Sequence, residues 1–258
     1  MATVPRVLRR LRPCLKRWNH SHSSLPLMRD LISRNTEITR NHLTPEIALK
    51  LITSSCPLWK AKPEECPFPD PFWAFYWPGG QAVTRFILDN PLLVRGLSVI
   101  DIGSGCGASA IAASKCGAKL AIANDIDPGI AAELNAALNN ASICTSTENL
   151  IPEGDAVKYI TKDHLPWDVI IVGDLFYDIS MSQKVLAWVT KCASLGINIL
   201  IGDPGRYAFT SEIKNDEDSK KENQREKPRL SVLARYPLPK ESCLENNGFL
   251  SASVWRVN

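Results

Sequence analysis

The stretch that most constrains the fold is Val99 to Ala108, which reads Val-Ile-Asp-Ile-Gly-Ser-Gly-Cys-Gly-Ala. A short apolar run with an acid near its end, followed by glycines at alternate positions and small residues at helical spacing, predicts a buried strand, a tight turn and a helix. Glycine lets the backbone approach a ligand where a Cβ would collide, and the start of the helix offers unpaired N–H groups. We therefore expect a nucleotide-type binding turn at Gly103, Gly105 and Gly107.

A second strand and a second acid complete this unit. Residues 120–124 form another apolar run that ends at Asp125, about 20 residues after the glycines, where an acid is placed to accept hydrogen bonds from ribose hydroxyls. Together these segments predict one βαβ unit. Further strands are expected at 167–173, 197–201, 230–236 and 250–257, and helices at 45–53, 81–88, 127–139 and around 185–189.

With a further strand expected to end within residues 147–150, this alternation predicts an α/β fold, a Rossmann-like seven-stranded sheet with helices on both faces. The last two strands are separated by prolines and by Asn-Asn-Gly, which predicts an antiparallel C-terminal hairpin at the sheet edge. The 258 residues, 45% of them hydrophobic and 22% charged, suffice for one sizeable core. No apolar run reaches the roughly 18 residues of a membrane-spanning helix.

Residues 1–24 differ from the rest of the chain. They hold six bases and no acid, and their apolar residues fall at helical spacing, which is typical of a mitochondrial transit peptide. A disordered basic tail that binds an acidic surface is the alternative. Removing six bases from a chain of net charge +3 leaves −3. A mildly acidic remainder lacks the basic footprint of a nucleic-acid-binding protein, so no nucleic-acid partner is expected.

The cysteines and histidines do not indicate a metal site. Eight cysteines include no Cys-x-x-Cys pair, and two of the four histidines lie within the predicted leader. Free thiols in a reducing compartment are the expected state. Cys56 and Cys66 flank part of a Pro-rich loop, and the sequence leaves open whether they pair.

Five of the chain's 19 aromatic residues lie within residues 72–77. At least three of them are expected to cover the sheet, and Trp77, which precedes Pro-Gly-Gly and a helix, is expected near a ligand. After the third strand, Asn149 is a positional guess for reading an adenine amino group. The mixed-charge run at 212–229 is expected to be a solvated insertion without a site.

Asp174 and Tyr177 follow the predicted strand at 167–173 directly. Ligands of open α/β sheets bind beyond the carboxyl ends of the strands, so both residues are expected in the same crevice as the glycine turn. The alternative for Asp174 is that it caps the helix after this strand.

The glycines alone do not identify the ligand, because Gly103, Gly105 and Ala108 also satisfy the dinucleotide pattern. Asp101, however, would repel a pyrophosphate and attract a cation. S-adenosylmethionine carries a sulfonium and an ammonium and no phosphate, which suits carboxylates at 101, 125 and 174. We therefore expect this cofactor rather than NAD or FAD.

These motifs, with Tyr-Trp-Pro-Gly-Gly at 76–80 and Gly-Asp-Pro-Gly-Arg at 202–206, resemble those of the seven-β-strand methyltransferases, and within them the family 16 protein-lysine methyltransferases. The resemblance covers roughly residue 37 to the C-terminus and departs at 140–165 and 211–228. Together with the leader inferred above from composition, it divides the chain into a mitochondrial transit peptide at 1–24, an N-terminal helical and aromatic extension at 25–90 and an S-adenosylmethionine-dependent methyltransferase domain at 91–258. It also implies the mitochondrial matrix as location and the electron transfer flavoprotein β subunit as protein substrate.

The resemblance further implies displacement of the sulfonium methyl group by a lysine ε-amine, with Asp174 positioning the amine and Tyr177 lining its channel. Only the neutral amine is a nucleophile, and a lysine of pKa about 10.4 is mostly protonated near neutral pH. A nearby carboxylate stabilises the ammonium further, so Asp174 is expected to orient rather than to act as a strong base. Two other functions stay open: a ribosomal-protein lysine methyltransferase and a non-catalytic cofactor-binding scaffold.

Overall fold

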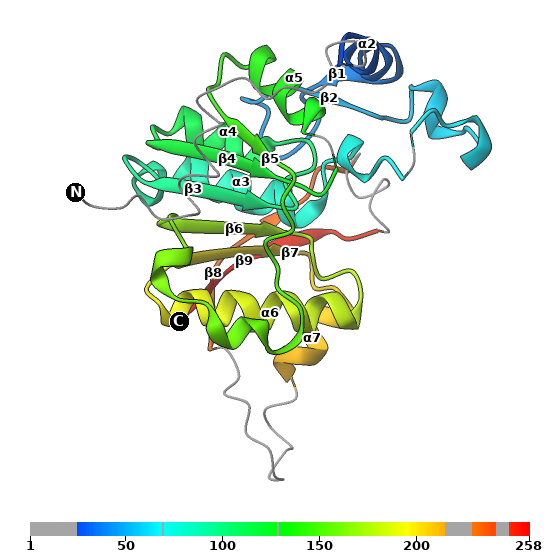
Figure 1. Cartoon of the computed structure of the whole chain (residues 1–258). Helices are drawn as coiled ribbons and strands as arrows, with labels where there is room; N and C mark the ends of the chain where they lie inside the picture. Colours follow the sequence, from blue (N-terminus) through cyan, green and yellow to red (C-terminus); the bar gives the residue numbers. More distant parts are fainter. Residues whose placement is uncertain (1–24, 69, 128, 215–228, 241–247) are drawn as a thin grey trace.

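The structure is a computed structural model (Figure 1), which describes residues 25–68, 70–127, 129–214, 229–240 and 248–258. The predicted leader at 1–24 and residues 215–228 of the mixed-charge run lie outside the described residues. Within the described part of the chain, no helix has the length and apolar character to cross a membrane.

A seven-stranded sheet forms the centre of the molecule, in the order β5-β4-β3-β6-β7-β9-β8. The first five strands in this order are parallel, and β9 and β8 are antiparallel to their neighbours. The predicted α/β class, the seven strands and the C-terminal hairpin are therefore confirmed. The strands are β3 (Ser98–Ile102), β4 (Leu120–Asn124), β5 (Cys144–Ser146), β6 (Val169–Gly173), β7 (Asn198–Asp203), β8 (Leu230–Pro237) and β9 (Ser251–Val257).

Two hydrophobic layers cover the sheet, because alternate residues of each strand point to opposite faces. In β3, Val99 packs in the layer with α3 (Pro78–Asp89), α4 (Ala108–Lys115) and α5 (Ile130–Leu138). Its neighbour Ile100 packs in the layer with α6 (Ile179–Ser194) and α7 (Tyr207–Lys214). Figure 1 shows α6 and α7 together on one side of the strands.

Helix α5 begins later than the sequence predicts. Its first residue is Ile130 and its N-cap is Gly129, so the expected cap at Asp127 is wrong. A Cβ on Gly129 would lie 2.7 Å from the Cβ of Thr145 in β5, which shows how closely this helix start packs on the sheet.

The helix expected at 45–53 is also wrong, because this segment contains β2 (Leu49–Leu51), which pairs with β1 (Glu37–Thr39). Leu49 and Leu51 are buried on either side of a half-buried lysine, a strand pattern. The amide oxygens of two α5 residues, Asn139 and Asn135, accept the backbone N–H groups of Ala48 and Lys50. These tertiary hydrogen bonds outweigh the local preference for a helix start that Pro45 and Glu46 give to this segment.

The remaining elements are short. Helix α2 (Leu25–Asn35) is tied to α5 by an ion pair of Arg29 with Glu133. The 3-10 turns are η2 (Pro57–Trp59), η3 (Pro63–Glu65), η4 (Phe72–Ala74), η5 (Pro91–Leu93), η6 (Gly154–Tyr159) and η7 (Lys162–His164).

The aromatic cluster at 72–77 is placed differently from the expectation that most of it covers the sheet. Tyr76 packs in the sheet layer, whereas Trp73 and Phe75 pack in small clusters of the N-terminal region and Phe72 is exposed. Cys56 and Cys66 are both free thiols, which answers the question that the sequence left open.

Candidate functional site

Four neighbouring strands end in residues that meet at one edge of the sheet. In sheet order β4, β3, β6 and β7, the residues at or just after the strand ends are Asp125, Gly103, Asp174 and Asp203. Parallel strands bring their carboxyl ends to the same edge, which is where ligands of this architecture bind. The structure therefore brings the glycine turn and Asp174 together, as predicted.

The glycine turn, residues 103–107, requires glycine for its backbone and for its neighbours. Gly103, Gly105 and Gly107 have φ values of 65°, 49° and 80°, in the left-handed region that side chains disfavour. A Cβ on Gly103 would lie 2.5 Å from the side chain of Leu175, and one on Gly107 would lie 2.7 Å from the Cβ of Ala132. At Gly105 the nearest heavy atom would be 3.6 Å away, so this glycine keeps the most room beside it.

Two acids flank this turn. The Oδ2 atom of Asp125 accepts the backbone N–H of Gly105 at 2.7 Å, and its Oδ1 atom accepts the N–H of Asp127 at 3.1 Å. Asp101 is buried, and burial together with the nearby charge of Asp125 raises the pKa of its carboxyl to about 8. Further negative charge beside Asp101 is therefore unfavourable, which disfavours a phosphate and favours a cationic ligand.

This chemistry fits S-adenosylmethionine. The left-handed glycine backbone with room at Gly105 can approach a ligand closely, and the acid at 125 stands after β4, where a ribose is expected in this architecture. The negative charge of Asp125, and a buried Asp101 carboxyl that a nearby cation would help to ionise, suit a ligand that carries a sulfonium and an ammonium. Within the described residues, no group of three or more metal-ligating side chains is present.

On the other side of this edge lies a set of contacts that we call the carboxylate clamp: Asp174, Arg206 and the first residues of α3. The Oδ2 atom of Asp174 accepts the backbone N–H groups of Gly79 and, at 3.1 Å, Gly80. Its Oδ1 atom accepts Nε and Nη2 of Arg206 at 3.0 and 2.9 Å. Asp174 thus caps α3, while Asp178 caps α6 through the N–H of Met181, so the predicted helix-capping alternative for Asp174 is wrong for α6.

Asp174 itself is held in an unfavourable environment. It is only 7% exposed and has a φ of 58°, which is rare for a residue with a side chain. Burial raises the pKa of its carboxyl, and the opposing effects of Arg206 and of the two α3 amides only partly offset this. Strain and burial of this kind gather at functional sites, where the surrounding structure enforces them.

Glycines allow the start of α3 to reach Asp174. A Cβ on Gly79 would lie 2.1 Å from the carbonyl oxygen of Gly202, and one on Gly173 would lie 2.9 Å from the Cα of Gly80. Gly173 and Gly202 are register partners in β6 and β7. Backbone therefore packs on backbone here, and the two α3 amides cannot shift away from the carboxylate.

Asp203 holds the loop that carries Arg206. Its Oδ1 atom accepts the N–H groups of Gly205 at 2.6 Å and Arg206 at 2.8 Å. Its Oδ2 atom is buried without a hydrogen-bond partner. Burial, with the charge of Asp174, raises the pKa of Asp203 to about 7.

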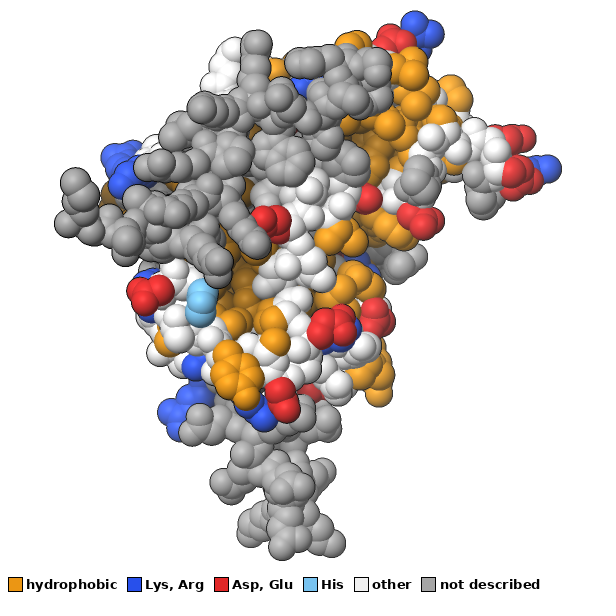
Figure 2. Space-filling view, in the orientation of Figure 1, with side chains coloured by type: hydrophobic (Ala, Val, Ile, Leu, Met, Phe, Trp, Pro, Cys, Tyr) orange, Lys and Arg blue, Asp and Glu red, His pale blue; other side chains and the backbone are white. Residues whose placement is uncertain are grey.

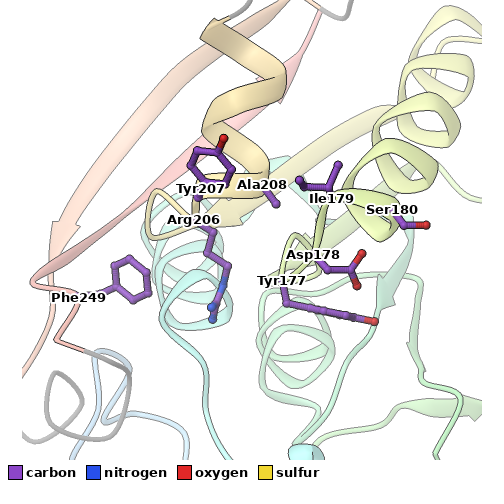
Figure 3. A pocket seen from close by; sticks show the side chains of 8 residues that line it. All are labelled: Tyr177, Asp178, Ile179, Ser180, Arg206, Tyr207, Ala208 and Phe249. Atoms are coloured by element: carbon purple, nitrogen blue, oxygen red, sulfur yellow. The ribbon is translucent and has the colours of Figure 1, made fainter.

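A pocket of about 550 Å³ opens beside the carboxylate clamp. In Figure 3, Arg206 extends between Phe249 and Tyr177, which come from different elements. Tyr177 is 58% exposed, so its ring forms a wall of the pocket rather than part of the core. The lining residues are Tyr177, Asp178, Ile179, Ser180, Arg206, Tyr207, Ala208 and Phe249.

Two residues predicted to bind the cofactor, Trp77 and Asn149, do not contact the glycine turn in the contacts described above. Trp77 lies beside Arg206, whose guanidinium carbon is 6.0 Å from the ring centre, whereas it is Trp73 whose Cα approaches Gly105. Asn149 is exposed, and its side-chain oxygen accepts the N–H of Ile151. The cofactor-binding roles of Trp77 and Asn149 stay predictions.

The sequence did not identify some of the site residues: Arg206, Asp203 and the register partners Gly173 and Gly202. The available signal was the Gly-Asp-Pro-Gly-Arg stretch at the end of a predicted strand, at the same edge as Asp174. Glycines at the ends of two neighbouring strands were a second signal, because they mark a close approach of another backbone.

The chain is similar to known methyltransferases. Residues 85–180 match the family model "Ribosomal protein L11 methyltransferase (PrmA)". The electron transfer flavoprotein beta subunit lysine methyltransferase of Danio rerio is 42% identical over 249 residues, 94% of this chain and 88% of that protein. Its Homo sapiens counterpart is 38% identical over 244 residues, 92% of this chain and 85% of that protein.

A similar solved structure is a ribosomal protein L11 methylase from Lactobacillus delbrueckii subsp. bulgaricus. It is 22% identical, with a TM-score of 0.41, and the match covers 68% of this chain and 77% of that one.

Proposed function

Because the chain belongs to the family of electron transfer flavoprotein β subunit lysine methyltransferases, we propose that its own substrate is the β subunit of an electron transfer flavoprotein. The chain is an S-adenosylmethionine-dependent protein-lysine methyltransferase. The observation that carries the substrate proposal is the extent of the match, which covers 94% of this chain and so extends well beyond the cofactor half.

The cofactor, when bound, supplies an electrophilic methyl group on a sulfonium. We assign its binding to the glycine turn at 103–107 with Asp101 and Asp125, on the charge and backbone arguments above. The pocket beside the carboxylate clamp opens at the neighbouring strand end, and Leu175 connects the two by packing on Gly103. The residues after β3 therefore bind the cofactor, and those after the adjacent strand β6 bind the substrate amine.

Asp174 is suited to orient an amine rather than to remove its proton. Both of its oxygens accept hydrogen bonds from two N–H groups each, and an ionised carboxylate beside an ammonium stabilises the protonated amine. Orientation of two reacting groups is by itself a large source of rate. Tyr177 and Phe249 form apolar walls that strip water from the amine, which favours its neutral, nucleophilic form.

A ribosomal-protein substrate is the second candidate, because the matching family model carries that description. That match covers residues 85–180, the cofactor half, and stops before the loop of Arg206. The L11 methyltransferase of Lactobacillus johnsonii likewise matches only 45% of this chain. The part of the chain that builds the pocket therefore favours the electron transfer flavoprotein.

The charge distribution on one face of the molecule does not favour a nucleic-acid substrate. On the face that Figure 2 shows, Lys and Arg side chains of the described residues stand in separate small groups, not in one continuous basic surface. Such a surface is what phosphate backbones require.

The test incubates the purified chain with labelled S-adenosylmethionine and, in parallel, electron transfer flavoprotein, ribosomal protein L11, total RNA and mitochondrial extract. We expect label in the flavoprotein β subunit, on lysines identified by mass spectrometry. Label in L11 or RNA instead would refute the substrate proposal. Cofactor binding without any labelled product would identify a non-catalytic scaffold.

We also propose that residues 1–24 direct the protein to the mitochondrial matrix, on the basis of their six bases, lack of acids and helical spacing. A fluorescent fusion of residues 1–30 tests this. Import into mitochondria is expected, and a diffuse cytosolic signal would contradict the proposal.

A further inference from the structure

The carboxylate of Asp174 has no hydrogen-bonding position left for a substrate. An ionised carboxylate offers about four lone-pair sites. Here each oxygen already accepts two N–H groups, from Gly79 and Gly80 on one side and from Arg206 on the other. A lysine amine that is to reach Asp174 must therefore replace one of these donors.

Only one of the donors is free to leave. Gly79 and Gly80 start α3, and their backbone packs directly on that of Gly173 and Gly202: a Cβ on Gly79, Gly173 or Gly202 would lie within 3 Å of the opposing backbone. Arg206, by contrast, donates through a long side chain with several rotatable bonds. Its side chain is 17% exposed, against 4% for that of Asp174, and it lines the open pocket.

The surroundings of Arg206 are suited to such a movement. Asp203 holds its backbone N–H, so the point from which the side chain swings is fixed. The guanidinium carbon already lies 6.0 Å from the ring centre of Trp77 and 5.5 Å from that of Phe249. Aromatic faces attract a guanidinium, so the side chain keeps favourable contacts when it leaves the carboxylate.

We propose that Arg206 is a placeholder for the substrate's lysine: it occupies Asp174 in the free protein and yields Oδ1 to the incoming amine. This inference rests on the proposed function only in naming the amine as a substrate lysine. The exchange of cations at Asp174 does not depend on which protein is the substrate. One cation replaces another, so the buried carboxylate is never left unpaired. The exchange makes Arg206 a specificity-determining residue, because only a side chain long and cationic enough to displace it gains access.

The first test measures cation binding without any methyl transfer. The full-length Arg206→Met variant keeps an apolar chain of similar length against the two rings, and Arg206→Ala serves as a second variant. We expect n-butylammonium and ethylguanidinium each to raise the Tm of these variants by about 3 °C at saturating concentration, relative to sodium chloride of equal ionic strength. The wild type, whose Asp174 is occupied, should not respond.

The matched control is the double variant Arg206→Met with Asp174→Asn, in which the response should vanish. If neither cation binds the single variants, or if ethylguanidinium binds and n-butylammonium does not, the placeholder proposal is overturned. Because no methyl acceptor is present, this result is independent of which protein is the substrate.

The second test is kinetic and separates a placeholder from a residue that helps the reacting complex. In Arg206→Met the KM for the protein substrate should fall about 3- to 10-fold, and ethylguanidinium should inhibit competitively with that substrate. A residue needed in the reacting complex would do the opposite: KM would rise or kcat would fall, and ethylguanidinium would restore turnover. That second pattern refutes the proposal.

Discussion

The glycine turn and the carboxylate clamp lie at the same edge of one sheet but are built in opposite ways. The glycine turn with Asp125 comes from a single βαβ unit, and its special feature is backbone conformation: three glycines with positive φ. The carboxylate clamp joins residues 79, 174 and 206, far apart in the sequence, and its special feature is a saturated set of hydrogen bonds. The first part is open to a ligand, whereas the second must exchange a partner to receive one.

The largest effect is expected at Asp174, the carboxylate that we propose orients the substrate amine. Asp174→Asn removes the charge and replaces one acceptor oxygen by an NH₂ group, which cannot accept from Arg206 or the α3 amides. We expect kcat/KM to fall about 100-fold, equivalent to roughly 3 kcal/mol, with cofactor affinity changed much less. Steady-state kinetics and a separate cofactor-binding measurement check this.

The matched control for that variant is Asp168→Asn, the same change at the opposite end of β6. Asp168 is exposed, and its side chain accepts the N–H of Ser98 there. Full turnover in Asp174→Asn with unchanged cofactor affinity would mean that Asp174 serves only to cap α3. The carboxylate clamp would then have no role in the reaction.

The next effect concerns the rigidity of the carboxylate clamp. In Gly79→Ala the new Cβ would lie 2.1 Å from the carbonyl oxygen of Gly202, with backbone on both sides unable to yield. We expect a loss of about 3 kcal/mol of unfolding free energy, measured by denaturant unfolding. Gly80→Ala is the control: its Cβ would meet only the Tyr76 ring, at 3.7 Å, and alanine favours the helix. Equal stability of the two variants would contradict the close packing described here.

A smaller effect is expected in the glycine turn. Asp125→Ala removes the acceptor of the Gly105 N–H and the negative charge of this carboxylate beside the turn. S-adenosylmethionine should bind about 10-fold more weakly, roughly 1.4 kcal/mol for a charged hydrogen bond, while the KM for the protein substrate changes little. Isothermal titration measures the affinity. A variant that loses protein-substrate binding instead would show that the two halves are not separate in function.

The smallest effect is a pH dependence of stability from Asp203. Its pKa is raised to about 7 in the folded protein, above its value in the unfolded chain, so the folded state binds the proton more tightly. The resulting stabilisation is present below pH 4 and is lost as the pH rises to about 7. Asp101, with a pKa of about 8, adds a similar loss that extends to higher pH.

The variant Asp203→Asn tests this, since asparagine does not titrate. Its Tm should fall less than that of the wild type between pH 5 and pH 8. Parallel Tm curves over this range would show that Asp203 is not a buried titrating group.

Local patterns in the sequence were sufficient for much of the fold. The βαβ unit, the strand before Asp174 and the C-terminal hairpin follow from hydrophobic periodicity and turn residues, and the structure confirms them. The segment at 45–53 shows the limit. Its helix signals are local, but Asn135 and Asn139 of a helix about 85 residues away supply the hydrogen-bond acceptors that make it part of a strand pair.

The sequence by itself determined the glycine turn, because left-handed backbone conformation and the acids around it are encoded by neighbouring residues. It also determined that Asp174 would stand at a strand end beside this turn. Only the tertiary structure decided what Asp174 contacts. That Arg206 and the start of α3 converge on one carboxylate depends on which strands are neighbours and how closely a helix packs across them, and no spacing along the chain encodes either.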